Sequence, residues 1–123
     1  MSRLRVLACL AAAAALVCAA TATAQPSARA AAKCDIRSKQ RKLGPTYVLS
    51  LSVSKTSCRT GQRVVTAYYR CRIKAGGKKG RCHSSVLGYR CSERRSGIKT
   101  EFDAKVSCKK GSARVDHTYT QFT

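Results

Sequence analysis

The chain has 123 residues, with 25 lysines and arginines, five aspartates and glutamates, and a formal net charge of +20 at pH 7. Five carboxylates leave little for a catalytic pair of the glycosidase kind, and the length excludes two sizeable domains. The positive electrostatic field of such a chain favours polyanionic partners, among them nucleic acid, anionic lipid surfaces and acidic wall polymers. The alternative is that the charge only keeps an exported protein soluble.

The first 24 residues have the pattern of a secretory signal peptide. A charged start at residues 1–5 precedes an apolar run over residues 6–20, and Ala22 and Ala24 supply the small residues that signal peptidase requires. The run is shorter than the roughly 20 residues that span a bilayer. We therefore expect cleavage after Ala24, a secreted or extracytoplasmic protein, and no transmembrane segment in the mature chain.

Six cysteines remain once Cys9 and Cys18 leave with the signal peptide. An even number in a small exported domain predicts three disulfides, because a core of this size is helped by cross-links. The cysteines lack zinc-ligand spacing, so we expect no metal and no cofactor. Two of the 25 basic residues, Arg3 and Arg5, also leave, so 23 basic residues face five acidic ones. The remaining cysteines are Cys34, Cys58, Cys71, Cys82, Cys91 and Cys108.

Residues 25–45, QPSARAAAKCDIRSKQRKLGP, mix alanine, serine and basic residues with few large apolar side chains. This composition is typical of a flexible basic arm that is tied down only where Cys34 is bridged. Residues 46–123 have the length of a single small domain. The sequence therefore predicts a signal peptide at 1–24, an arm at 25–45 and one disulfide-linked domain at 46–123.

The segment YVLSLSVS at residues 47–54 alternates between apolar and polar positions. Tyr47, Leu49, Leu51 and Val53 fall on one face, and serines fall on the other. Because successive side chains point to opposite faces of a strand, we predict a half-buried strand with a polar outer side.

The segment CRTGQRVVTAYYRCR at residues 58–72 has helical periodicity. At 100° per residue its cysteines, valines and tyrosines share one arc, so we predict an amphipathic helix of about three and a half turns over residues 59–72. Arg72 breaks the pattern, and we expect it to snorkel or to follow the last turn. The cations of the outer arc are Arg59, Arg63, Arg70 and Lys74.

Residues 74–81, KAGGKKGR, form a glycine-rich basic loop between Cys71 and Cys82. The Walker pattern is absent and the loop follows a helix instead of opening one, so a plain exposed loop is favoured over a phosphate-binding loop. Its Lys78, Lys79 and Arg81 would extend the helix cations into one continuous ridge.

Residues 87–119 predict three antiparallel strands, with turns at residues 96–97 and 110–111. The two turns place the same face of residues 100–108 in the core, and this agreement supports a meander because a slip of one residue would expose the apolar set. The expected pairs are Val106 with Val115, Phe102 with Tyr119, Ala104 with His117, Cys108 with Ala113, Lys105 with Asp116, Leu87 with Val106, Tyr89 with Ala104, Cys91 with Phe102 and Arg90 with Asp103.

Together these elements predict a two-layer α+β domain in the order β-α-β-β-β, with one helix on a mostly antiparallel sheet of about four strands. Cys71 and Cys82 flank the glycine loop and should pair. Cys91 and Cys108 would lie roughly 17–20 Å apart by strand rise, too far to bridge. A helix over residues 59–72 spans about 20 Å, similar to the strands, so if its end leads into the next strand, its beginning lies near Cys91. The other predicted disulfides are therefore Cys58 with Cys91 and Cys34 with Cys108.

Two histidines in a basic, disulfide-linked, exported chain suggest a small ribonuclease, in which imidazoles serve as general base and general acid. His83 directly follows Cys82, and His117 lies on the inward face of the last strand. Nothing in their spacing brings the two rings together. We therefore assign no catalytic residue and keep a ribonuclease-like hydrolase using His83 and His117 as the alternative function.

The favoured function is non-enzymatic binding of an anionic polymer or cell-surface component by a monomer. Sequence-specific recognition of nucleic acid is disfavoured, because no DNA-reading motif or aromatic stacking platform is present. The competing explanation of the basic stripe is that the outer face of a surface helix must be polar in any case, and that its polar residues here happen to be basic. The predicted anion-binding residues are Arg59, Arg63, Arg70, Lys74, Lys78, Lys79 and Arg81.

Three stretches, SCRTGQRVVTAYYRCR, VLGYRCSE and FDAKVSCKKG, resemble a group of small secreted bacterial proteins of uncharacterised function. In that group a cysteine opens a Val-Val-x-x-Tyr helix, and later strands carry an aromatic-x-Cys element and a Val-x-Cys-x-x-Gly element. The resemblance covers residues 57–123 and implies an exported, disulfide-linked α+β domain. It implies no activity, substrate or catalytic residue.

Overall fold

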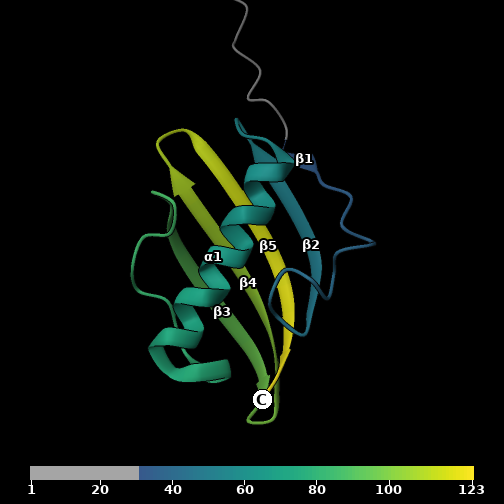
Figure 1. Cartoon of the computed structure of the whole chain (residues 1–123), viewed down its shortest axis with the longest axis vertical. Coiled ribbons are helices and arrows are strands. Elements are labelled where there is room, and N and C mark those ends of the chain that lie inside the picture. The colour runs from purple at the N-terminus through teal and green to yellow at the C-terminus, as the bar shows by residue number, and fades with distance from the viewer. Residues whose placement is uncertain (1–30) are drawn as a thin grey trace, which may run out of the picture.

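The computed structural model describes residues 31–123, so the predicted signal peptide and its cleavage site lie outside the described residues. A five-stranded antiparallel sheet in the order β1-β2-β5-β4-β3 carries one long helix across one of its faces (Figure 1). The predicted two-layer α+β architecture is confirmed, with one short strand more than expected. The elements are β1 (Ala32–Lys33), β2 (Tyr47–Ser54), α1 (Cys58–Gly76), the short 3-10 helix η1 (Gly77–Lys79), β3 (Arg90–Ile98), β4 (Glu101–Lys110) and β5 (Ala113–Phe122).

Helix α1 begins at a polar cap and ends at a glycine. The hydroxyl of Ser57 accepts a hydrogen bond from the backbone N–H of Thr60 at 3.1 Å, which satisfies one of the unpaired amides of the first turn. Gly77 follows the last turn with φ +66°, and its N–H donates to the carbonyl of Ile73. The helix therefore continues four residues beyond the predicted end at Arg72, and this places Arg72 inside the last turns.

The inner face of α1 packs on the sheet through Val64, Val65 and Tyr68, all of which are buried. Gly61 lies at a close approach of helix and strand, because a Cβ atom there would come within 2.7 Å of Val53 Cγ1. The absence of a side chain at Gly61 thus sets how near α1 lies to β2.

Strand β2 lies where it was predicted, but its alternation is interrupted. The pairing with β5 shifts between Val48 and Ser50, so Val48 is fully buried while Leu49 is 53% exposed. This irregularity acts as a β-bulge, which changes the phase of a strand by one residue. The predicted inward face is therefore right for Leu51 and Val53 and wrong for Leu49.

The three-stranded meander is present, but both predicted registers are wrong. The β4–β5 turn lies at Gly111 and Ser112, so Val106 faces His117 and Cys108 faces Val115. The β3–β4 turn lies at Lys99 and Thr100. Both displacements are even-numbered, by two and six residues, so the buried face is kept while every cross-strand partner changes.

Two of the three predicted disulfides are wrong for the same reason. The register places Cys91 directly opposite Cys108, with their Cα atoms 4.0 Å apart, and these two residues form a disulfide. Cys34 is joined to Cys58. Only the predicted Cys71–Cys82 bond is confirmed.

The described part of the predicted arm, residues 31–45, packs against the domain. Ala32 and Lys33 form β1 on the edge of β2, and Ile36 and Leu43 are buried in the core. The segment is thus attached through a strand and two apolar side chains as well as through Cys34, which differs from the flexible arm that its composition suggests.

Candidate functional site: a cationic groove on the helix

A groove of about 960 Å³ lies over the outer surface of α1. One wall is the solvent side of the helix, and the opposite wall is formed by residues 81–87, which return from η1 towards β3. Neither aspartate nor glutamate lines this groove. We call it the helix groove; its cations are Arg59, Arg63, Arg70, Lys74 and Arg81.

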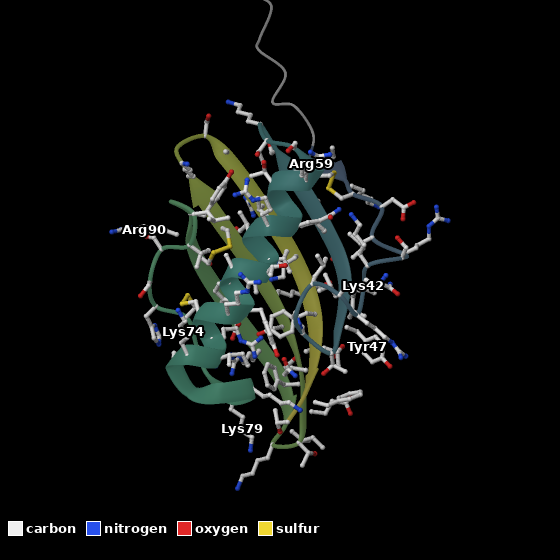
Figure 2. The ribbon with its side chains drawn as sticks, viewed as in Figure 1. Lys42, Tyr47, Arg59, Lys74, Lys79 and Arg90 are labelled. Carbon is white, nitrogen blue, oxygen red and sulfur yellow. A yellow bond between two sulfur atoms is a disulfide. The ribbon has the colours of Figure 1, made fainter. Side chains whose placement is uncertain are left out.

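The geometry of α1 aligns four of these cations. Positions 59, 63, 70 and 74 fall within one arc at 100° per residue, opposite the buried valines. Arg59 and Lys74 lie near the two ends of the helix (Figure 2), and their separation of 15 positions corresponds to about 22 Å of helix. The groove is therefore an elongated row of positive charge and suits an extended anion better than a small one.

The helix cations lack compensating charges. Within residues 31–123 no ion pair is formed by any of the four helix cations, Arg59, Arg63, Arg70 and Lys74. Arg59 with Arg63 and Arg70 with Lys74 are like-charged neighbours four residues apart, an arrangement that costs an isolated helix about 0.2–0.5 kcal/mol per pair. Arg59 also lies at the positive end of the helix dipole, and the first turn carries no acidic residue. A bound anion would relieve all three repulsions.

The second wall of the groove is tethered to the helix covalently. The Cys71–Cys82 disulfide joins the last turns of α1 to the start of the returning segment. The residues on either side of Cys82 line the groove, namely Arg81, His83, Ser84 and Ser85. The disulfide thus fixes the distance between the helix cations and the groups across from them.

Two arginines hold the preceding loop by its backbone. Arg72 donates from Nε to the carbonyl of Gly80 at 3.2 Å and from Nη2 to the carbonyl of Lys78 at 2.7 Å. Arg95 donates to the carbonyls of Lys79 and Gly80. These contacts hold η1 against the sheet and so position Arg81 at the end of the groove.

Glu93 on β3 is the counter-charge of this arrangement. Its carboxylate accepts hydrogen bonds from Tyr68 at 2.9 Å and from Tyr119 at 2.7 Å, forms an ion pair with Arg95, and lies 3.7 Å from Arg72 Nε. Burial opposes ionisation of Glu93, but the hydrogen bonds from Tyr119, Arg95 and Tyr68 outweigh it and hold its pKa below the ordinary value. Glu93 is therefore a structural anion and is not poised to exchange protons near neutral pH.

Burial and the nearby carboxylate also shift the partners of Glu93. Burial raises the pKa of the Tyr68 and Tyr119 hydroxyls, and the negative charge of Glu93 raises both further. Both hydroxyls thus stay protonated and act as donors. Arg72 is fully buried and also lies against the ring of Tyr119, with 4.6 Å between guanidinium carbon and ring centre.

The structure brings five of the seven predicted anion-binding residues into one groove. Lys78 and Lys79 lie in η1 and do not line it, although they are exposed. Lys79 projects at the end of the molecule beyond α1 (Figure 2). The continuous ridge expected from the sequence therefore divides into the helix groove and a separate basic tip.

The two histidines are in different environments. His83 is exposed and lines the helix groove. His117 is buried in the core, where its ring lies against those of Tyr68 and Tyr119, and burial lowers its pKa to about 4. The structure does not bring the two imidazoles together in an accessible site.

Sequence reasoning missed the residues that hold the loop leading into the groove's second wall. The prediction that Arg72 snorkels or follows the last turn is wrong, because Arg72 lies within α1 and is fully buried. The sequence gives Glu93 and Arg95 no role, because their partnership with Arg72 depends on tertiary contacts. One signal was available: Cys91, Glu93 and Arg95 alternate on the inward face of β3, and an acid and a base on a buried face require partners. Arg72, on the apolar arc of α1, is the buried partner of Glu93.

Comparison with family models, with curated proteins and with solved structures gives no match. Three disulfides indicate an oxidising, extracellular compartment. Over the described range, no helix has the length and apolarity needed to cross a membrane. In the same range no three potential metal ligands of the His, Cys, Asp or Glu type lie together.

Proposed function

We propose that this chain is a secreted bacterial domain that binds linear anionic polymers through the helix groove without catalysing a reaction. The observation that carries the proposal is the charge of the groove: five cations and no carboxylate line it. Four of those cations have no ion-pair partner within residues 31–123. A surface that only keeps the protein soluble does not require its cations to share one concave site, because net charge promotes solubility wherever the charges lie.

The proposed ligand carries repeated phosphate, sulfate or carboxylate groups. Arginine offers a planar, bidentate pair of donors to each of these groups, and three of the four helix cations are arginines. A row of about 22 Å is too long for one small anion to contact. Binding to a polymer would release condensed counterions, so the affinity should fall steeply as salt rises.

Heparin is a suitable probe because it is a linear, densely sulfated polymer. We propose to measure its dissociation constant over a series of salt concentrations for the wild-type protein and for the Arg63→Glu/Arg70→Glu variant. The variant should bind at least about tenfold more weakly at low salt, and its salt dependence should be flatter by about one unit of logarithmic slope per lost contact. Folding should persist, because both replacements turn repulsive pairs into attractive pairs four residues apart.

The matched control is Lys42→Glu/Lys99→Glu, which changes the net charge by the same amount. Lys42 and Lys99 are exposed and do not line the helix groove. If affinity depends on the groove, this control should retain most of the wild-type affinity. Equal losses of heparin affinity in the two variants would show that net charge alone governs binding, and would refute binding at the helix groove.

The non-enzymatic part of the proposal has its own test. His83 is exposed in the groove beside Arg81, so single-turnover assays with RNA would detect any hydrolysis there. We expect no turnover above background. Turnover that disappears in the His83→Ala variant would contradict the proposal and identify the groove as an active site.

A further inference from the structure

The face of the sheet opposite α1 carries a second cationic surface. Arg90, Lys109 and Arg114 face one another across the three adjacent strands β3, β4 and β5. Four residues further along β3, Arg94 faces Lys105 of β4. All five side chains are exposed. We call this set the sheet surface.

The register makes this surface more positive than the sequence suggested. The pairs Arg90 with Asp103 and Lys105 with Asp116 would have neutralised two cations, but Arg90 lies opposite Lys109 and Lys105 lies opposite Arg94. Like charges directly opposite one another in adjacent strands are destabilising. Within the part of the chain that the structure describes, only Arg114 of this set forms an ion pair, with Asp116 at 2.7 Å.

The space between the two rows of cations is concave and polar. A hollow of about 440 Å³ is lined by Arg94, Lys105 and Arg114 and by hydroxyl-bearing residues of neighbouring strands. Asp116 also lines it, paired with Arg114, so three cations and one carboxylate leave the lining positive. The Ser107 hydroxyl oxygen in this hollow is buried and has no hydrogen-bond partner among the described residues. A buried hydroxyl without a partner costs free energy, so a ligand group that reached it would gain affinity. The hydroxyl-bearing residues are Ser50, Ser52, Ser92, Ser107 and Thr118.

We propose that the sheet surface is a second binding site for a linear anionic polysaccharide, so that one molecule bridges two polymer segments. The helix groove and the sheet surface lie on opposite sides of the two-layer domain. Helix α1 covers one face of the sheet (Figure 1), and the cation rows occupy the exposed positions that alternate with the buried ones on the other face. A single segment therefore cannot follow a straight path across both. The bridging part of the proposal rests on the proposed function of the helix groove, whereas the sheet surface is an independent site.

The chemistry of the hollow favours a polysaccharide over a single-stranded nucleic acid. Hydroxyl groups and cations together suit a polymer that carries both sugar hydroxyls and acidic groups. Single-stranded nucleic acids gain much of their affinity from bases stacked on aromatic rings. No phenylalanine, tyrosine or tryptophan lines the hollow, and the ring of His117 packs on the opposite side against Tyr68 and Tyr119.

The variant Lys105→Glu/Lys109→Glu tests the sheet surface without disturbing the core. Both lysines are exposed on β4, and the new carboxylates would face Arg94, Arg90 and Arg114. These opposite-charge pairs should keep or raise the melting temperature. If the melting temperature falls instead, Lys105→Gln/Lys109→Gln removes the charges without introducing new ones and serves the same test.

Calorimetry with a short heparin fragment measures the number of sites directly. The wild-type protein should bind two fragments per molecule, and Lys105→Glu/Lys109→Glu and Arg63→Glu/Arg70→Glu should each bind one. The control Lys42→Glu/Lys99→Glu should still bind two. Two fragments bound by the sheet variant would overturn the second site while leaving the groove intact. Two fragments bound by the groove variant would overturn the groove while leaving the sheet surface intact.

Light scattering with long heparin tests bridging. Scattering should rise at intermediate ratios for the wild type and the control, and should stay near the baseline for either single-surface variant. Equal scattering by all four proteins would contradict bridging. Replacing heparin by single-stranded DNA of similar charge should give weaker binding to the sheet surface, and tighter binding of the DNA there would overturn the assignment to a polysaccharide.

Discussion

The carboxylate of Glu93 lies 3.7 Å from the guanidinium of Arg72, and both side chains are withdrawn from solvent, at 3% and 0% exposure. This pair links β3 to the end of α1, and Arg72 extends the link to the carbonyls of Lys78 and Gly80. This buried ion pair therefore helps to hold the loop after the helix, together with Arg95 and the Cys71–Cys82 bond. Through that loop it also helps to position the start of the helix groove's second wall.

Replacing Glu93 by glutamine should destabilise the fold strongly. Glutamine keeps the shape of the side chain but leaves Arg72 buried without a counter-charge, and breaking a buried pair in this way costs about 3–5 kcal/mol. Chemical denaturation of the Glu93→Gln variant measures the change in the free energy of unfolding. The control is Asp35→Asn, which removes an exposed pair with Arg37 and should leave the denaturation midpoint almost unchanged. Equal stability of the Glu93 variant and the wild type would mean that the buried pair contributes nothing.

His117 should make the fold less stable in mild acid. Burial lowers its pKa from 6.5 to about 4, so between these values the unfolded chain takes up a proton that the folded chain refuses. Stability is therefore fully present above pH 6.5 and is lost as the pH falls to 4, by about 1.4 kcal/mol per pH unit within that window.

The His117→Phe variant isolates this effect, because phenylalanine can occupy the same place between the aromatic rings without titrating. Its free energy of unfolding should be nearly constant from pH 6.5 to 5, whereas that of the wild type should fall. Parallel pH profiles for the two proteins would show that His117 is not the responsible group. Below pH 4.5 both profiles should fall, since the depressed pKa of Glu93 stabilises the folded state only while the carboxylate is ionised.

Mapping of disulfides in the non-reduced protein tests the register of β3 and β4. Proteolysis and mass spectrometry should recover the bonds Cys34–Cys58, Cys71–Cys82 and Cys91–Cys108. A peptide that joined Cys58 to Cys91 would require a different register between β3 and β4. In that register the cations of the sheet surface would no longer face one another.

Replacing Gly61 by alanine should destabilise the domain although alanine favours helices. The gain in helix propensity is about 1 kcal/mol, whereas overpacking a tight contact costs about 1–3 kcal/mol, and the new Cβ would lie 2.7 Å from Val53 Cγ1. We expect a net loss on the order of 1 kcal/mol in thermal unfolding. Combining it with Val53→Ala makes room for the new methyl group, so the double variant should be more stable than the two single losses added together. Strict additivity would show that the two positions do not touch.

The fold was predictable at the level of faces, and the pairing of the strands was not. Apolar alternation along β4 and β5 identifies which side is buried, but registers that differ by two or six residues bury the same side chains. Gly97 illustrates why the turn was misplaced. It lies within β3 opposite Phe102, where a Cβ would come within 2.7 Å of the Phe102 Cα. The glycine thus serves close backbone approach and does not form the turn.

The candidate site was predictable where local geometry determines it. The spacing of Arg59, Arg63, Arg70 and Lys74 follows from helical periodicity alone, and these residues do line one groove. Arg81 could be placed in the groove only through the Cys71–Cys82 bond and the loop that Arg72 holds. Lys78 and Lys79, adjacent in sequence to these residues, fall outside the groove because η1 turns away from the helix face.

The central claim is that the helix groove contacts an anionic polymer, and the chemical shifts of backbone amides report that contact residue by residue. During titration of the isotopically labelled protein with a short heparin fragment, the largest shifts in residues 58–87 should fall at Arg59, Arg63, Arg70 and Lys74 and along residues 81–85. They should reverse when salt is added. Shifts confined to Lys78 and Lys79, or an unchanged spectrum of residues 59–74 at a fragment concentration that saturates binding, would contradict the account.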